Sequence, residues 1–144
     1  VFNTRREQWP LSLLFLDLDD FKQINDRHGH AVGDNCLRAV VQAISAELHY
    51  GDHLGRLGGE EFVLGLPGAD RVRAMATAEH LRRKIETECR NVEGIEVALT
   101  VSIGVTECSA TDNVASLIKR ADKAMYVAKH GGRNRVAMLD ATTG

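Results

Sequence analysis

The chain has 144 residues, enough for one domain with its own core, and 44% of them are hydrophobic, which argues against a disordered chain. The net charge of −2 excludes a general attraction to nucleic acid, and no apolar run reaches the ~18 residues of a membrane span. Cys36, Cys89 and Cys108 lack the spacing of a zinc site and fit a reducing environment. We therefore expect a cytoplasmic domain that contacts neither nucleic acid nor membrane, whether or not its parent protein is membrane-anchored.

Apolar periodicity predicts the elements of the first part of the chain. Residues 1–10 are polar and basic and look like the end of a helix that begins upstream. A continuous apolar run at 11–18 predicts a strand buried on both faces, and 21–27 suits a short helix. A longer helix is predicted at 35–49, where apolar residues recur every three or four positions.

A hairpin is predicted around Gly58-Gly59, because apolar runs flank the pair and glycine accepts the positive φ of a tight turn. Four elements follow it: a helix at 70–89, a strand at 95–106, a helix at 113–130 and a closing strand at 134–139. Gly104 interrupts a β-branched run and marks a bulge or a close approach of another backbone. Hairpins with helices between them predict an α+β fold, in which helices pack on a mainly antiparallel sheet.

Acidic residues gather at two boundaries between these elements. Asp17 lies among the last apolar residues of the first strand, where a charge needs a cation, a basic partner or strong donors. Asp19 or Asp20 can instead cap the helix that follows. Glu60 and Glu61 come directly after the two glycines of the hairpin. Two adjacent acids at such a tip form either a solvated turn or a cation site that a bulky ligand can approach.

Five sequence blocks, in this order, resemble the GGDEF family of diguanylate cyclases in its GGEEF variant. The blocks, which span nearly the whole chain, are Asp17–Lys22, Ile24–Asp26, Gly29–Asp34, Arg56–Phe62 and Ala128–Asn134. The resemblance implies a fold similar to the palm of nucleotide cyclases and polymerases. It also implies that two GTP molecules are condensed into cyclic di-GMP and pyrophosphate, at the interface of two domains that each present one GTP.

The same resemblance implies how the chain is organised. Residues 1–144 form one GGDEF domain, and the family usually begins with a helix preceded by a D-x-L-T-G-L segment, which this sequence does not contain. We therefore expect the chain to be a fragment of a larger signalling protein with an upstream sensory or dimerising region.

The resemblance assigns the acids to metal binding and catalysis. Asp17, Glu60 and the backbone carbonyl of Leu18 would hold Mg²⁺, for which Mn²⁺ can substitute. Glu61 would either support a second metal ion or help to deprotonate the ribose 3′-hydroxyl. Gly58-Gly59 would let the α-phosphate and the ribose lie against the turn, where a Cβ would clash.

Asn25 and Asp34 correspond to the residues that read guanine. An Asp accepts hydrogen bonds from the N1–H and N2–H₂ edge of guanine, a donor edge that adenine lacks. Both residues could instead cap helices, and Asp34 stands just before the helix predicted at 35–49. His30 is interpreted as a pocket or structural residue, because His28 and His30 have no further ligands at zinc spacing.

Lys129 and Arg133 would hold the β- and γ-phosphates, although cations also favour a helix C-terminus for electrostatic reasons alone. Backbone amides of the 19–22 turn, including that of Phe21, would add donors to the phosphates, and Lys22 would add charge.

Many members of the family carry an inhibitory R-x-x-D site. Here its first position is His49, and its acid is kept as Asp52. Histidine does not replace the planar fork of arginine well, so we expect weak or absent product inhibition.

Overall fold

The computed structural model describes residues 9–141, so most of the helix end predicted at 1–10 lies outside the described residues. The elements are strand β1 (Leu11–Leu18), helices α2 (Phe21–His28) and α3 (His30–Ser45), strands β2 (His53–Gly58) and β3 (Glu61–Pro67), helix α4 (Arg71–Glu88), strands β4 (Asn91–Val92), β5 (Ile95–Glu96) and β6 (Val101–Glu107), helix α5 (Val114–His130) and strand β7 (Val136–Met138).

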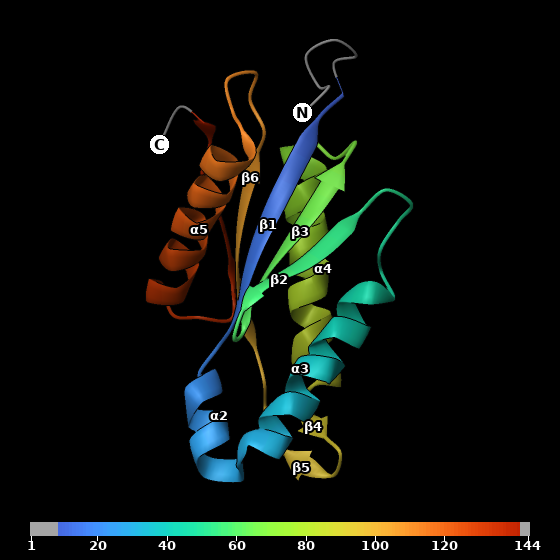
Figure 1. Ribbon diagram of the computed structural model, residues 1–144, viewed down its shortest axis with the longest axis vertical. Helices are drawn as coiled ribbons and strands as arrows, with labels where there is room; N and C mark the ends of the chain where they lie inside the picture. Colours follow the sequence, from blue (N-terminus) through green and yellow to red (C-terminus); the bar gives the residue numbers. More distant parts are fainter. Residues whose placement is uncertain (1–8, 142–144) are drawn as a thin grey trace.

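Five strands form one sheet in the order β2-β3-β1-β6-β7, and β4 and β5 form a small hairpin apart from it. All neighbours in the large sheet are antiparallel except β6 and β7, which run parallel. β1 therefore lies at the centre of the sheet, with the β2–β3 hairpin on one side (Figure 1). The α+β fold with flanking helices and a mainly antiparallel sheet is confirmed.

Side chains of β1 alternate between two apolar clusters, as successive residues of a strand must. Leu14 and Leu16 belong to the larger cluster, which they share with residues of α3 and α4. Leu13 and Phe15 belong to a smaller cluster with residues of α5. The sheet is thus covered on both faces, with α4 behind it and α5 on the opposite side in Figure 1.

Gly104 of β6 lies where the sheet and α5 come very close together. A Cβ at this position would lie closer than 3.0 Å to backbone atoms of Ala121 and Met125. The expected close approach is confirmed, and the irregular register lies elsewhere, between Arg56 and Gly58 of the hairpin.

The boundaries predicted for α3 are wrong. The helix begins at His30 rather than at residue 35, because Gly29, with φ of 92°, ends α2 and turns the chain directly into α3. It also ends at Ser45, four residues early. Asp34 therefore lies inside the helix and is not its N-cap, which removes the capping alternative for this residue.

The strand predicted at 95–106 is also shorter than expected. It begins at Val101, because Ile95 and Glu96 pair with β4 in a separate hairpin. The turn of that hairpin contains Glu93 and Gly94, which have φ of 51° and 84°.

Candidate active site

The acidic residues of the two predicted boundaries meet at one end of β1. Asp17 lies opposite Glu61 in the antiparallel register, and the Leu18 amide donates to the Glu60 carbonyl at 3.2 Å. The turn between β2 and β3 is closed by Arg56, whose guanidinium donates to the Gly59 carbonyl at 2.9 and 2.6 Å. Gly59 has a φ of 46°, which favours glycine.

Lys129, in the last turn of α5, places its ammonium group among these acids. Its Nζ lies 3.0 Å from Asp17 Oδ1, 3.4 Å from the Leu18 carbonyl oxygen and 3.4 Å from Asp19 Oδ1. The buried Asp17 thus has the basic partner that its position in an apolar run requires.

Asp19 is not a helix cap, contrary to one of the two alternatives. It is buried, and its carboxylate accepts hydrogen bonds from Thr100 Oγ1 at 2.7 Å, Ser102 Oγ at 2.6 Å and the Asn134 amide at 2.9 Å. Asp20 takes the N-cap position of α2, with φ of 55° and no side-chain capping bond. Asp19 therefore joins β1 to β6 and to the chain that follows α5.

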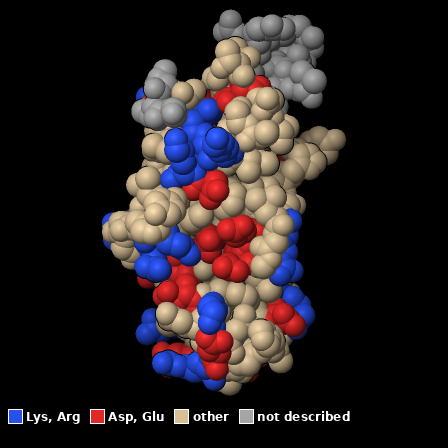
Figure 2. Space-filling view, turned by 60° about the vertical axis from the view of Figure 1, so that its left-hand side comes forward, with Lys and Arg blue, Asp and Glu red and all other residues tan. Residues whose placement is uncertain are grey.

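Burial dominates the electrostatics of the acids. Desolvation raises the pKa of Asp17, the ion pair with Lys129 opposes this, and the charges of Glu60 and Asp19 add to it. Desolvation also raises the pKa of Glu61, followed by repulsion from Asp17. Figure 2 shows one face of the molecule, on which acidic side chains gather near the middle with basic side chains on both sides.

The second predicted phosphate ligand, Arg133, lies in the turn after α5. Arg133 Nε is 3.4 Å from Asp20 Oδ1, beside the start of α2. Arg133 and Asn134 have φ of 65° and 48°, and the Asn134 side chain is held by Arg82 and by Glu86 of α4, at 2.8 and 2.9 Å. The two predicted phosphate ligands thus pair with neighbouring acids, Lys129 with Asp17 and Asp19 and Arg133 with Asp20.

The predicted guanine readers lie on neighbouring helices. The Asn25 side-chain oxygen is buried and accepts no hydrogen bond from the described residues. It packs against the backbone of Gly33, where a Cβ would overlap it and would lie 3.3 Å from the Phe21 ring. Asp34 is the next residue and is exposed, so an unpaired acceptor and a free carboxylate stand on adjoining helices.

The other predicted substrate residues are placed less directly. His30 is exposed at the start of α3, and Lys22 pairs with Asp26 at 3.2 Å on the outer side of α2. The Phe21 ring is buried, so only its backbone amide can serve a ligand.

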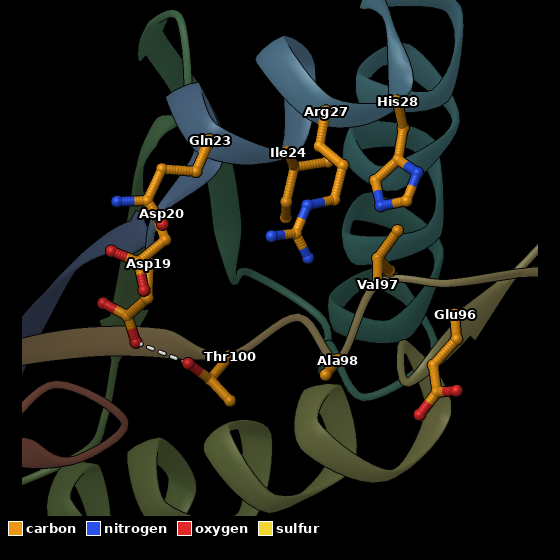
Figure 3. A pocket seen from close by; sticks show the side chains of 10 residues that line it. All are labelled: Asp19, Asp20, Gln23, Ile24, Arg27, His28, Glu96, Val97, Ala98 and Thr100. Atoms are coloured by element: carbon orange, nitrogen blue, oxygen red, sulfur yellow. Dashed lines mark hydrogen bonds between the residues drawn. The ribbon is translucent and has the colours of Figure 1, made fainter.

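A polar cavity of about 200 Å³ adjoins the buried acids, and sequence reasoning did not foresee it. It lies between α2 and the segment before β6, with Gln23 and Arg27 on one side and Thr100 on the other (Figure 3). Asp19, Asp20 and Ile24 belong to the sequence blocks given above, but only the folded chain brings the lining residues of the 96–100 segment beside them.

His49 and Asp52, the residues predicted to form a degenerate inhibitory site, lie in the turn that precedes β2. Asp52 accepts the His49 amide at 2.8 Å, and both residues line a cavity of about 240 Å³. Arg73 of α4 lines the same cavity, so a guanidinium is present there from an element that the sequence motif does not include.

The donors at the end of β1 fit a hard divalent cation. Asp17 and the Leu18 carbonyl both point an oxygen at one cation, the Lys129 ammonium, and oxygen ligands are those that Mg²⁺ prefers. Within the described part of the chain, no three His, Cys, Asp or Glu residues are already grouped as a metal site. A metal ion would thus rely on the carbonyl, on solvent and on the substrate's phosphates as well.

The mainly antiparallel, palm-like sheet, with carboxylates and cations at one end of its central strand, is typical of the nucleotide cyclase class of proteins. The family model described as "Diguanylate cyclase, GGDEF domain" matches residues 2–135. The chain belongs to this family.

Relatives and solved structures agree. The chain is 39% identical to diguanylate cyclase DosC of Shigella sonnei over 143 residues and 40% identical to diguanylate cyclase A of Treponema denticola over 129 residues. These matches cover 99% and 89% of this chain but 31% and 35% of the relatives, so the chain spans about a third of their length.

Two solved structures illustrate the match in three dimensions. The GGDEF domain of DgcB from Caulobacter crescentus, in complex with c-di-GMP, matches with a TM-score of 0.87 and 32% identity over 94% of this chain and 81% of that one. The active GGEEF domain of a diguanylate cyclase from Vibrio cholerae matches with a TM-score of 0.85 and 33% identity over 94% and 86%. Among the described residues, no helix is long and apolar enough to cross a membrane.

Proposed function

We propose that this domain is a diguanylate cyclase, which condenses two GTP molecules into cyclic di-GMP and pyrophosphate. The observation that carries the proposal is the ion pair of Asp17 with Lys129 at the end of β1, beside the turn that carries Glu60 and Glu61. Carboxylates that can hold a metal and a cation that can hold phosphate are both needed to transfer a nucleotidyl group.

The 3′-oxygen of one nucleotide forms a bond to the α-phosphorus of the other, and the bond from that phosphorus to pyrophosphate breaks. Lys129 and Arg133 would hold the β- and γ-phosphates as negative charge grows on the leaving group. Mg²⁺, or Mn²⁺ in its place, would be held by Asp17, the Leu18 carbonyl and Glu60, and would neutralise charge on phosphoryl oxygens.

Glu61 is a candidate acceptor for the 3′-hydroxyl proton. Its pKa is raised by burial and by the neighbouring Asp17, which favours taking up a proton. The alternative role is that of a ligand of a second metal ion, and both roles are proposed here for the same carboxylate.

Guanine would be read by Asn25 and Asp34. The side-chain amide of Asn25 would pair with N3 and N2 of the base, and the exposed carboxylate of Asp34 would accept from N1–H and N2–H₂. His30 and the 21–22 backbone would border the same ligand.

The reaction needs two such domains, each presenting one GTP to the other. We propose that residues 1–144 are one domain of a larger signalling protein, that an upstream sensory region brings two copies together, and that the reaction takes place in the cytoplasm. Product inhibition at the His49–Asp52 turn would be weak.

The test is GTP turnover with Mg²⁺ at several protein concentrations, with the product identified by mass. While the domain is mostly monomeric, we expect the rate of cyclic di-GMP formation to rise roughly with the square of the protein concentration. Glu60→Ala should abolish product, whereas Glu88→Ala, an exposed acid on α4, should not change it. Full activity of Glu60→Ala would contradict the assignment of Glu60 as a metal ligand. Binding of GTP without turnover by the unchanged chain would indicate a regulatory module.

A further inference from the structure

The Lys129 ammonium lies against two of the oxygens that would hold the proposed metal ion. It bridges Asp17 Oδ1 at 3.0 Å and the Leu18 carbonyl at 3.4 Å, which are two of the three proposed metal ligands. A magnesium ion would bind the same two oxygens at about 2.1 Å. The ammonium and a divalent cation are therefore alternative occupants of these oxygens.

Asp19 is a further partner of the ammonium in this same position. Its carboxylate lies 3.4 Å from Lys129 Nζ and is fixed by Thr100, Ser102 and the Asn134 amide, so its place does not depend on the lysine. Only 19% of the Lys129 side chain is exposed. Rotation about the bonds of this unbranched side chain can move the ammonium group. A nucleoside triphosphate would offer this cation a stronger acceptor.

We propose that Lys129 is a built-in counter-ion, which blocks the metal oxygens of the nucleotide-free domain and frees them when it moves to the triphosphate. This inference rests on the proposed function for the identity of the nucleotide, but not for the competition between the two cations. Divalent metal should therefore bind weakly to the free domain and tightly only together with nucleotide.

The test measures Mn²⁺ binding to the nucleotide-free chain by the electron paramagnetic resonance signal of free Mn²⁺. Lys129→Met should bind Mn²⁺ at least about tenfold more tightly than the unchanged protein, because a positive charge leaves a partly buried carboxylate site. Lys119→Met removes the same charge from an exposed position on the same helix and should change the affinity less than about twofold. Lys129→Gln repeats the test with a polar side chain, should Lys129→Met fail to fold.

Two further measurements assign the gain to this site. Asp17→Asn added to Lys129→Met should remove the tighter binding. A non-hydrolysable GTP analogue should strengthen Mn²⁺ binding to the unchanged protein by a larger factor than to Lys129→Met.

An equal or lower Mn²⁺ affinity in folded Lys129→Met and Lys129→Gln would overturn the inference. Because the readout needs no turnover, this result would leave the proposed cyclase activity standing if cyclic di-GMP is still formed by the unchanged protein. Conversely, the variants could bind Mn²⁺ more tightly while the unchanged protein forms no cyclic di-GMP. This result would support the counter-ion role of Lys129 and contradict the proposed cyclase activity.

Discussion

Alanine at Gly104 should destabilise the domain strongly, because this glycine is where β6 touches α5. The added Cβ would overlap backbone atoms of Ala121 and Met125, which no rotation of a side chain can relieve. Gly65 of β3 offers a matched control: it also lies in the sheet, and the nearest atom to its added Cβ is the His53 carbonyl at 3.9 Å, an ordinary contact.

The magnitude follows from these two environments. Overpacking a close-packed core usually costs ~1–3 kcal/mol, and a clash between two backbones belongs at the upper end, so Gly104→Ala should cost about 3 kcal/mol. Gly65→Ala should instead stabilise by ~0.4–1 kcal/mol, since alanine has fewer unfolded conformations than glycine. For a domain of this size, 3 kcal/mol corresponds to a fall in Tm of about 6–12 °C.

Urea and thermal unfolding followed by circular dichroism measure both variants. A fall in stability below about 1 kcal/mol for Gly104→Ala would show that α5 can move away from β6 without loss, and would refute the packing argument. Because α5 carries Lys129 in its last turn, the folded fraction of Gly104→Ala should also turn over GTP more slowly.

Three further predictions concern the substrate, the product and an ion pair. Asp34→Ala should raise the KM for GTP about tenfold or more and weaken the preference over ATP, whereas Asp26→Ala on the outer side of α2 should not; steady-state kinetics with both nucleotides decide this. His49→Arg should bind cyclic di-GMP more tightly than the unchanged chain does, as measured by calorimetry. Equal affinities would mean that the guanidinium of Arg73 already binds the ligand in this cavity. The guanidinium of Arg120 holds the pKa of Asp112 far below its ordinary value of 3.8, so this carboxylate stabilises the fold above that pH and loses its effect as the pH falls further. Asp112→Asn should therefore cost about 3 kcal/mol at pH 7 and progressively less below pH ~4 in urea unfolding, since the pair is buried.

Local patterns were enough to predict most elements and the main acids. The apolar run of β1 and the paired runs around Gly58-Gly59 are short-range signals, and the strand and hairpin formed where predicted. The start of α3 was missed because its first turn contains Gly33 and carries no periodic apolar signal, while Gly29 was free to adopt the φ of 92° that joins two helices.

The partners of Asp19 could not be predicted, because they come from distant parts of the chain. Thr100, Ser102 and Asn134 are separated from it by 81, 83 and 115 residues. A helix cap was the only role that local sequence suggested for this acid. The pairing of Lys129 with Asp17, across 112 residues, was equally invisible, although both residues were named for their chemistry.

Backbone strain concentrates where these distant segments meet. Asp20, Arg133 and Asn134 are three of the five non-glycine residues with positive φ in the described chain. Such conformations cost ~1–3 kcal/mol each and persist only where the surroundings hold them. Here the surroundings are the hydrogen bond from the Asn134 amide to Asp19 and the hydrogen bonds of the Asn134 side chain to α4. The fold thus tolerates an unfavourable backbone conformation that keeps Arg133 and Asp20 at the edge of the acidic site.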